Sequence, residues 1–129
     1  MKVMTSGCFD ILHPGHIALL RKASEFGDVY VFINTDESIK RLKGKNRPIL
    51  SYEERKTMLK SIKYVHKVLP FSGDVPGEEL FALLKPNYYI KSDEYKDALP
   101  EMKWVEKYNV GMIWFERDKR YSTTKMVKK

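Results

Sequence analysis

The chain has 129 residues, 43% of them hydrophobic, and a formal net charge of +7. This length fits one domain spanning 1–129, the hydrophobic fraction excludes a disordered chain, and no apolar run approaches the ~20 residues that cross a bilayer. Because Cys8 is the only cysteine and the N-terminus lacks the apolar stretch of a signal peptide, an internal disulfide is excluded and a cytoplasmic location is expected.

Short β-rich runs alternate with helical patterns along the chain. Strands are predicted at 3–5, 29–33, 64–69, 88–90 and 110–115. Helices are predicted at 14–26, 51–62, 76–84 and 100–108, with a last short helix capped by 122–124. Near-continuous apolar strands suit a parallel sheet buried on both faces. The order βαβααβαβαβα therefore predicts an α/β fold: a single Rossmann-like doubly wound domain, with a five-stranded parallel sheet and helices on both faces.

The first strand leads into the segment Gly-Cys-Phe-Asp-Ile-Leu-His-Pro-Gly-His, residues 7–16. A tight glycine turn at a helix start offers backbone amides and a positive helix end to a polyphosphate. His13 and His16 lie three residues apart, so one helical turn places both imidazoles on one side. The segment predicts a phosphate site, for which the alternative is two histidines that only cap a helix.

Basic residues gather in three clusters: Arg41, Lys43, Lys45 and Arg47; Arg55, Lys56 and Lys63; Arg117, Lys119 and Arg120. A solvated surface, a nucleic-acid site, or a site for a triphosphate and a phosphorylated substrate would each account for such charge. No RNA- or DNA-binding signature accompanies the clusters, so the third interpretation is preferred. Between two helices, the polar stretch 43–50 is expected to be a mobile loop at the carboxyl edge of the sheet, where such folds bind ligands.

Gly7–His16, Ser51–Lys56 and Arg117…Ser122-Thr123-Thr124 together resemble the cytidylyltransferase-like nucleotidyltransferases, the His-x-Gly-His superfamily, and the resemblance covers essentially the whole chain. It implies that a substrate phosphate attacks the α-phosphorus of a nucleoside triphosphate and pyrophosphate leaves. The protein then supplies positioning and charge stabilisation, not a nucleophile. The rival hypothesis is a catalytically weak nucleotide-binding module.

The resemblance also assigns roles to individual residues. It implies catalytic roles for His13, His16, Lys43 and Arg117; nucleotide contacts from Gly7, Cys8, Phe9, Asp10, Gly15, Lys45, Asp93, Ser122 and Thr123; and substrate contacts from Lys63 and Arg55. Cys8 is expected to contribute its amide, not its thiol. Asp10 has the alternative of stabilising the turn, and Arg55 that of a partly structural role. The chain departs from the family pattern at Lys63, Ser92 and Arg120.

Two resemblances within the superfamily imply different substrates. The segment 51–56 and the spacing from Arg117 to 122–124 resemble glycerol-3-phosphate cytidylyltransferase, whereas 34–44 followed by Arg47-Pro48 resembles the adenylyltransferase domain that makes ADP-heptose. Arg117 favours CTP and a glycerol 3-phosphate-like acceptor; the alternative is ATP with a heptose 1-phosphate-like sugar phosphate. The resemblance further implies a homodimer and Mg²⁺ carried mainly by the nucleotide phosphates. No metal-ligand cluster, nucleic acid or membrane is expected.

Overall fold

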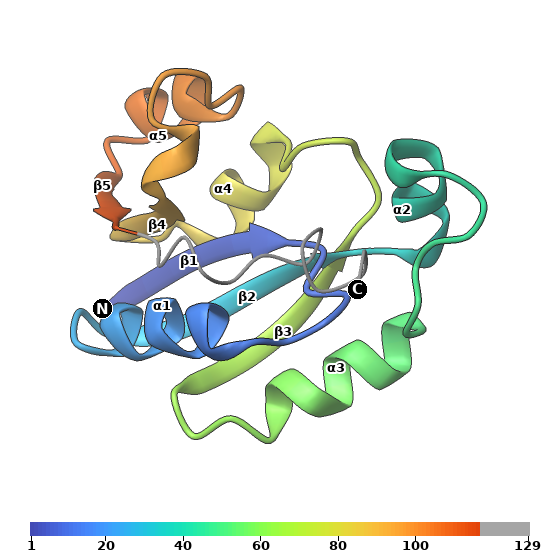
Figure 1. Ribbon diagram of the computed structural model, residues 1–129. Helices are drawn as coiled ribbons and strands as arrows, with labels where there is room; N and C mark the ends of the chain where they lie inside the picture. Colours follow the sequence, from blue (N-terminus) through green and yellow to red (C-terminus); the bar gives the residue numbers. More distant parts are fainter. Residues whose placement is uncertain (117–129) are drawn as a thin grey trace.

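The computed structural model describes residues 1–116, which form one parallel five-stranded sheet in the order β3-β2-β1-β4-β5 (Figure 1). The strands are β1 (Lys2–Gly7), β2 (Asp28–Asn34), β3 (Val65–Phe71), β4 (Tyr88–Ser92) and β5 (Gly111–Phe115). Every pairing between neighbouring strands is parallel. The predicted α/β fold class and all five predicted strands are confirmed, with shifts of at most two residues at their ends.

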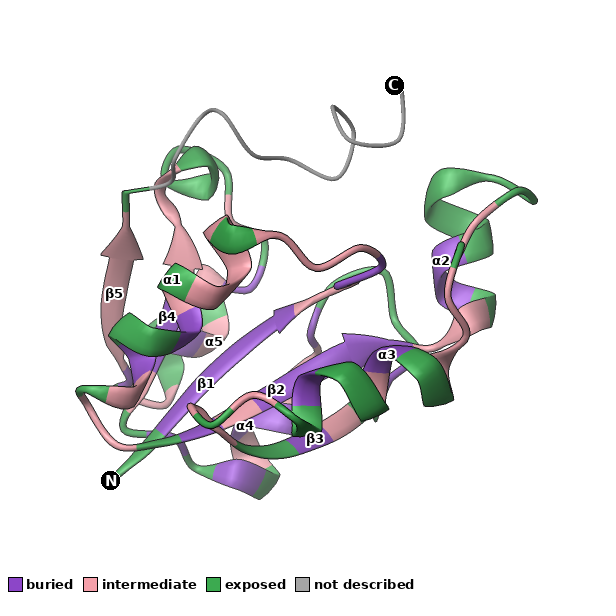
Figure 2. Ribbon diagram, turned by 60° about the horizontal axis from the view of Figure 1, so that its bottom comes forward, coloured by how far each residue is buried: buried purple, intermediate pink, exposed green. Residues whose placement is uncertain are grey.

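Two helix layers cover the sheet, and alternating strand residues divide between them. On the face of α1 (Pro14–Ser24) and α3 (Tyr52–Lys60), Val3, Val31 and Ile90 join one buried cluster. On the face of α4 (Glu78–Leu84) and α5 (Met102–Lys107), Met4 and other strand side chains join a second cluster with residues of those helices. Figure 2 shows β1 and much of β2 as buried. Burial on both faces explains why these strands are apolar without alternation.

The helix starts follow local capping chemistry. Ser51 and Glu54 form the predicted capping box of α3: the Glu54 amide donates to Ser51 Oγ, and the Ser51 amide donates to Glu54 Oε1. A short helix, α2 (Asp36–Lys43), stands beyond the carboxyl ends of the strands, and the sequence analysis fixed no bounds for it. The 3₁₀ helix η1 (Asp93–Tyr95) follows β4 directly. Within 1–116, no helix has the length and apolarity needed to cross a bilayer.

Candidate active site

A cleft of about 410 Å³ lies at the carboxyl edge of the sheet, where β1, β2 and β4 end. Its centre is the turn between β1 and α1, its β2 side carries α2 and the segment after β3, and its β4 side carries η1 and the start of α5. The lining from the predicted site comprises Gly7, Cys8, Phe9, Gly15, His13, His16 and Lys43. This is the place where open α/β sheets bind ligands.

The turn after β1 depends on an unusual backbone conformation at Phe9. Its φ is 48°, a left-handed value that costs a non-glycine residue about 1 kcal/mol. Burial of the Phe9 ring offsets that cost, since only 8% of the residue is exposed. The ring also lies so close to Gly7 that a Cβ added there would be 3.1 Å from it. Gly7 therefore permits the turn to fold back on itself.

His13 and His16 form a reciprocal cap at the start of α1. The Gly15 amide donates to His13 Nδ1 at 3.1 Å, and the His13 amide donates to His16 Nδ1 at 3.3 Å. The two rings stack with centroids 3.8 Å apart. Because both Nδ1 atoms accept hydrogen bonds, the proton of each neutral ring sits on Nε2. The histidines thus cap the helix through Nδ1 and carry their ring protons on Nε2.

Burial favours the uncharged form of both imidazoles. It lowers the pKa of His13, and burial followed by the neighbouring His13 lowers the pKa of His16 from 6.5 to about 4. Burial likewise raises the pKa of the Cys8 thiol, which donates to Asn34 Oδ1 at 3.4 Å. A thiol that keeps its proton is a poor nucleophile. The turn between β1 and α1 therefore offers neutral donors and backbone amides.

This arrangement predicts that acid destabilises the protein. The unfolded chain protonates His16 near its ordinary pKa of 6.5, whereas the folded chain does so only near 4, so stability falls as pH is lowered through that window. We expect a loss of roughly 2 kcal/mol between pH 7 and pH 5, measured by urea unfolding. In His16→Asn, which retains an acceptor for the cap, this loss should shrink. An unchanged pH dependence in the variant would contradict the assignment.

Asp10 holds the loop that follows α2. It is 1% exposed and accepts from Arg47 Nε at 2.6 Å and from the Ile49 and Leu50 amides at 2.9 Å. Burial alone would raise its pKa, but these hydrogen bonds and the Arg47 charge hold the pKa below its ordinary value. Asp10 is not among the described residues that line the cleft. Asp10 thus pins the end of the loop that was expected to be mobile, through residues 47–50, and its predicted nucleotide contact stays a prediction.

Arg55 is buried beneath the cleft, which favours the structural alternative over the predicted substrate contact. It is 1% exposed, which leaves no face for a ligand. Its guanidinium donates to the carbonyls of Leu50, Cys8 and Asn34 and to Asp36 Oδ1, at 2.7 to 3.1 Å. These bonds join the glycine turn, the end of β2, α2 and the loop. Arg55 therefore supports the cleft from beneath.

The structure places Lys63 away from the cleft, and its predicted substrate contact stays a prediction. Lys63 is exposed and precedes β3, with its ammonium 5.3 Å from the Tyr64 ring centroid. All strands are parallel, so this position lies at the amino edge of the sheet. β3 has 7 residues, which separates that edge from the cleft by roughly 20 Å.

The other predicted site residues differ in whether they line the cleft. Lys43, at the end of α2, lines the cleft, whereas the exposed Lys45 does not. Arg41 fixes α2 against the segment after β3, donating to the Ser72 carbonyl with Asp74 3.6 Å away. Asp93 starts η1 beside cleft-lining Ser92 without lining the cleft itself. Three predicted residues, Arg117, Ser122 and Thr123, lie outside the described residues.

The cleft also contains residues that the sequence analysis left without a role. Lys91 and Tyr95 line its β4 side, and Asn34 lines its β2 side. The signal for Lys91 was present, since a lysine directly after a buried parallel strand lies at the carboxyl edge of the sheet. Among the described residues, no three of His, Cys, Asp and Glu are grouped so as to hold a metal ion.

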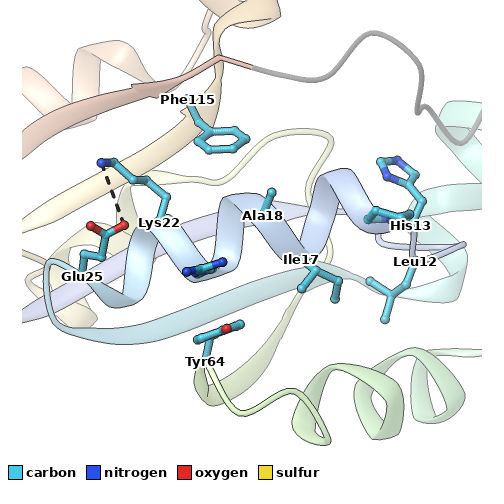
Figure 3. Close-up of a pocket in the computed structure, with 10 residues that line it drawn as sticks. Leu12, His13, Ile17, Ala18, Lys22, Glu25, Tyr64 and Phe115 are labelled. Carbon is cyan, nitrogen blue, oxygen red and sulfur yellow. Dashed lines mark ion pairs between the residues drawn. The ribbon is translucent and has the colours of Figure 1, made fainter.

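A second hollow, of about 750 Å³, runs along the outer surface of α1. In Figure 3, Phe115 and Tyr64 flank the helix on opposite sides, with Ile17 and Ala18 between them. Lys22 and Glu25 close one end as an ion pair of 3.9 Å. Its lining offers mainly apolar side chains, so a phosphorylated substrate fits the first cleft better.

Paired Nε2–H donors, a helix start and a glycine turn suit stabilisation of charge on a transferring phosphoryl group. Together with the sequence comparison below, they define the class of this protein as a nucleotidyltransferase. Residues 4–129 match the family described as cytidylyltransferase-like, and the chain belongs to that family.

Curated relatives are similar to the chain over nearly all of its length. A relative named "Bifunctional protein HldE" from Actinobacillus pleuropneumoniae is 42% identical over 131 residues, covering 98% of this chain and 27% of the relative. The protein of the same name from Vibrio cholerae serotype O1 is 50% identical over 95 residues, covering 73% of this chain and 20% of the relative. The chain thus spans about a quarter of the length of these relatives.

Solved structures share the fold. A lipopolysaccharide core biosynthesis protein from Thermoplasma volcanium superposes with a TM-score of 0.75 at 25% identity, covering 92% of this chain and 98% of the other. A protein from Archaeoglobus fulgidus superposes with a TM-score of 0.66 at 17% identity, covering 90% of each chain. The second likeness shows the fold alone.

Proposed function

We propose that the chain transfers the adenylyl group of ATP to the phosphate of a sugar 1-phosphate of the heptose type, releasing pyrophosphate. The observation that carries the proposal is the pair of stacked imidazoles, His13 and His16, which present Nε2–H donors at the carboxyl edge of the sheet. Donors aimed at a phosphorus centre stabilise the negative charge that develops as the bond to pyrophosphate breaks.

The cleft carries a lysine on either side of the histidines. Lys43 lies on the β2 side and Lys91 on the β4 side, so each half carries one ammonium group. Two phosphorylated reactants bound in these halves would meet at His13 and His16. Holding both in register removes much of the entropic barrier to their reaction. The attacking group is the acceptor phosphate itself, which requires no nucleophile from the protein.

The choice of ATP over CTP follows the relatives. The sequence analysis placed CTP first because of Arg117, which lies outside the described residues. Relatives named HldE, at 42% and 50% identity, instead favour the alternative of an ADP-heptose-forming adenylyltransferase domain. The similar structure titled as a lipopolysaccharide core biosynthesis protein supports a sugar acceptor.

Mg²⁺ remains a prediction, and so does the homodimer. The carboxylates that line the cleft are Asp74, Glu94 and Glu101, and they form no three-ligand group within the described residues. This donor set fits an ion that is bound mainly through the triphosphate, whose charge the ion would neutralise.

The test is pyrophosphate release with Mg²⁺, using ATP or CTP, each paired with heptose 1-phosphate or glycerol 3-phosphate. We expect release with ATP and heptose 1-phosphate, and a nucleotide-sugar product by ³¹P NMR. Release only with CTP and glycerol 3-phosphate would overturn the adenylyl proposal and restore the first prediction. Release with no pair would favour the nucleotide-binding module.

A further inference from the structure

Lys91 brings a positive charge to the cleft from the end of β4. Its Nζ donates to the Ser6 carbonyl at 3.0 Å and lies 4.5 Å from the centroid of the Tyr95 ring. Both Lys91 and Ser6 line the cleft, next to Gly7 at its centre. The ammonium is therefore held on the same surface as the two imidazoles.

Beneath Lys91 runs a buried polar chain that ends in a carboxylate. Tyr89 Oη donates to Glu101 Oε2 at 2.5 Å and lies 2.7 Å from Ser6 Oγ. Glu101 is 2% exposed and Tyr89 is fully buried. A buried carboxylate is costly unless a donor or an opposite charge faces it. Tyr89 supplies the donor, and Lys91 supplies the charge.

Charges on three elements bear on Lys91. Burial lowers its pKa, whereas Glu101 at the start of α5, Cys8 in the glycine turn and Glu94 in η1 raise it. Glu101 is the largest of the opposing contributions. Lys91 thus lies in the electrostatic field of a buried carboxylate and also lines the cleft.

The Lys91 ammonium has more N–H donors than the hydrogen bonds it makes within residues 1–116. An ammonium has three N–H donors, and among residues 1–116 Lys91 makes one hydrogen bond, to Ser6. The ladder between β1 and β4 pairs Val3 with Tyr88 and Met4 with Tyr89, so that bond also links the two strands beyond the ladder. A purely structural lysine would need only this link, and the test below separates the two roles.

We propose that Lys91 binds a phosphate group of the substrate in the cleft and that Glu101 is its positioning residue. The proposal deepens the proposed function and rests on it for the identity of the phosphates. The shared chemistry is an anionic phosphate oxygen, which belongs either to the nucleotide or to the sugar phosphate. Loss of a charged hydrogen bond of this kind weakens binding by about tenfold or more.

The first experiment measures binding by calorimetry, without turnover. Inorganic pyrophosphate, a non-hydrolysable ATP analogue and heptose 1-phosphate are each titrated into Lys91→Met and into the control Lys96→Met, which replaces an exposed lysine after η1. We expect Lys91→Met to weaken at least one ligand about tenfold or more and Lys96→Met to match the wild type. Weaker pyrophosphate and ATP-analogue binding assigns Lys91 to the nucleotide, and weaker heptose 1-phosphate binding assigns it to the acceptor. Wild-type affinity for all three overturns the proposal.

The second experiment tests Glu101 through pH. Removing its charge in Glu101→Gln should make Lys91 lose its proton at lower pH, while the amide still accepts from Tyr89. We expect pyrophosphate affinity to fall at lower alkaline pH in Glu101→Gln than in the wild type, with the ionisation of pyrophosphate common to both. Coincident pH profiles, with melting temperatures also equal, overturn the positioning role. Lys91→Arg keeps the charge at high pH and should flatten the alkaline limb.

These outcomes separate the two proposals. If no nucleotide and acceptor pair releases pyrophosphate but Lys91→Met still weakens pyrophosphate binding, the proposed function fails and the anion site stands. If the wild type transfers nucleotide and Lys91→Met binds all three ligands normally, the anion site fails and the function stands.

Discussion

Replacing His16 with alanine is expected to lower turnover by at least about 100-fold, the scale for removing one transition-state donor from an enzyme. The His16 ring is packed between two others, with the His13 ring centroid at 3.8 Å and the Phe9 ring centroid at 5.0 Å. Its Nδ1 is occupied by the His13 amide, so only Nε2–H is left to meet the phosphoryl group. The measurement is steady-state pyrophosphate release with saturating ATP and acceptor.

Two further variants show whether the loss is catalytic. His16→Asn keeps an acceptor for the His13 amide but lacks the distal Nε2, so it should fold like the wild type and still lose turnover. His66→Ala removes an exposed histidine on the edge strand β3 and should retain full activity. Near-normal turnover in His16→Ala would remove His16 from the reaction.

Replacing Arg55 with methionine is expected to destabilise the fold by about 3 kcal/mol or more. The change leaves three backbone carbonyls without their donor and Asp36 without its partner at 2.8 Å. Each buried acceptor left unsatisfied costs about 1 to 3 kcal/mol, although water entering the space would reduce the total. Urea unfolding at pH 7 measures the loss.

The controls for Arg55 test its two possible roles. Lys60→Met changes an exposed residue at the end of the same helix and should leave stability within about 0.5 kcal/mol. Arg55→Lys keeps the charge but loses the fork that reaches several carbonyls, so it should also destabilise. Wild-type stability in Arg55→Met, combined with a raised KM for the acceptor, would restore the predicted substrate contact.

The fold was predictable because its signals are local. Apolar runs without alternation indicate strands buried on both faces, and Ser51 with Glu54 indicates a helix start. The bounds of α2 were not predicted, because an 8-residue helix with two apolar side chains, Ile39 and Leu42, does not show where the helix begins and ends.

The site was predictable where one segment carries it and less so where distant segments meet. Residues 7–16 bring their own turn and helix start, so most of their side chains lie where expected. For Lys63, the motif match does not say at which edge of the sheet the residue lies. Its position before β3 places it at the amino edge. The surroundings of Arg55 and Lys91 come from distant segments and could not be predicted from the local sequence. Backbone carbonyls surround the Arg55 guanidinium, whereas Lys91 lines the cleft.

The left-handed turn at Phe9 has a consequence for how the protein meets its ligand. The Phe9 ring lies against one side of the His16 imidazole while His13 stacks on it, so the imidazole is immobilised before any ligand arrives. Freezing a side chain of this kind at the moment of binding costs about 0.5 to 1.5 kcal/mol. In this chain the entropy of ordering the His16 side chain is lost during folding. Phosphate binding therefore does not include that cost, and the affinity for phosphate is higher.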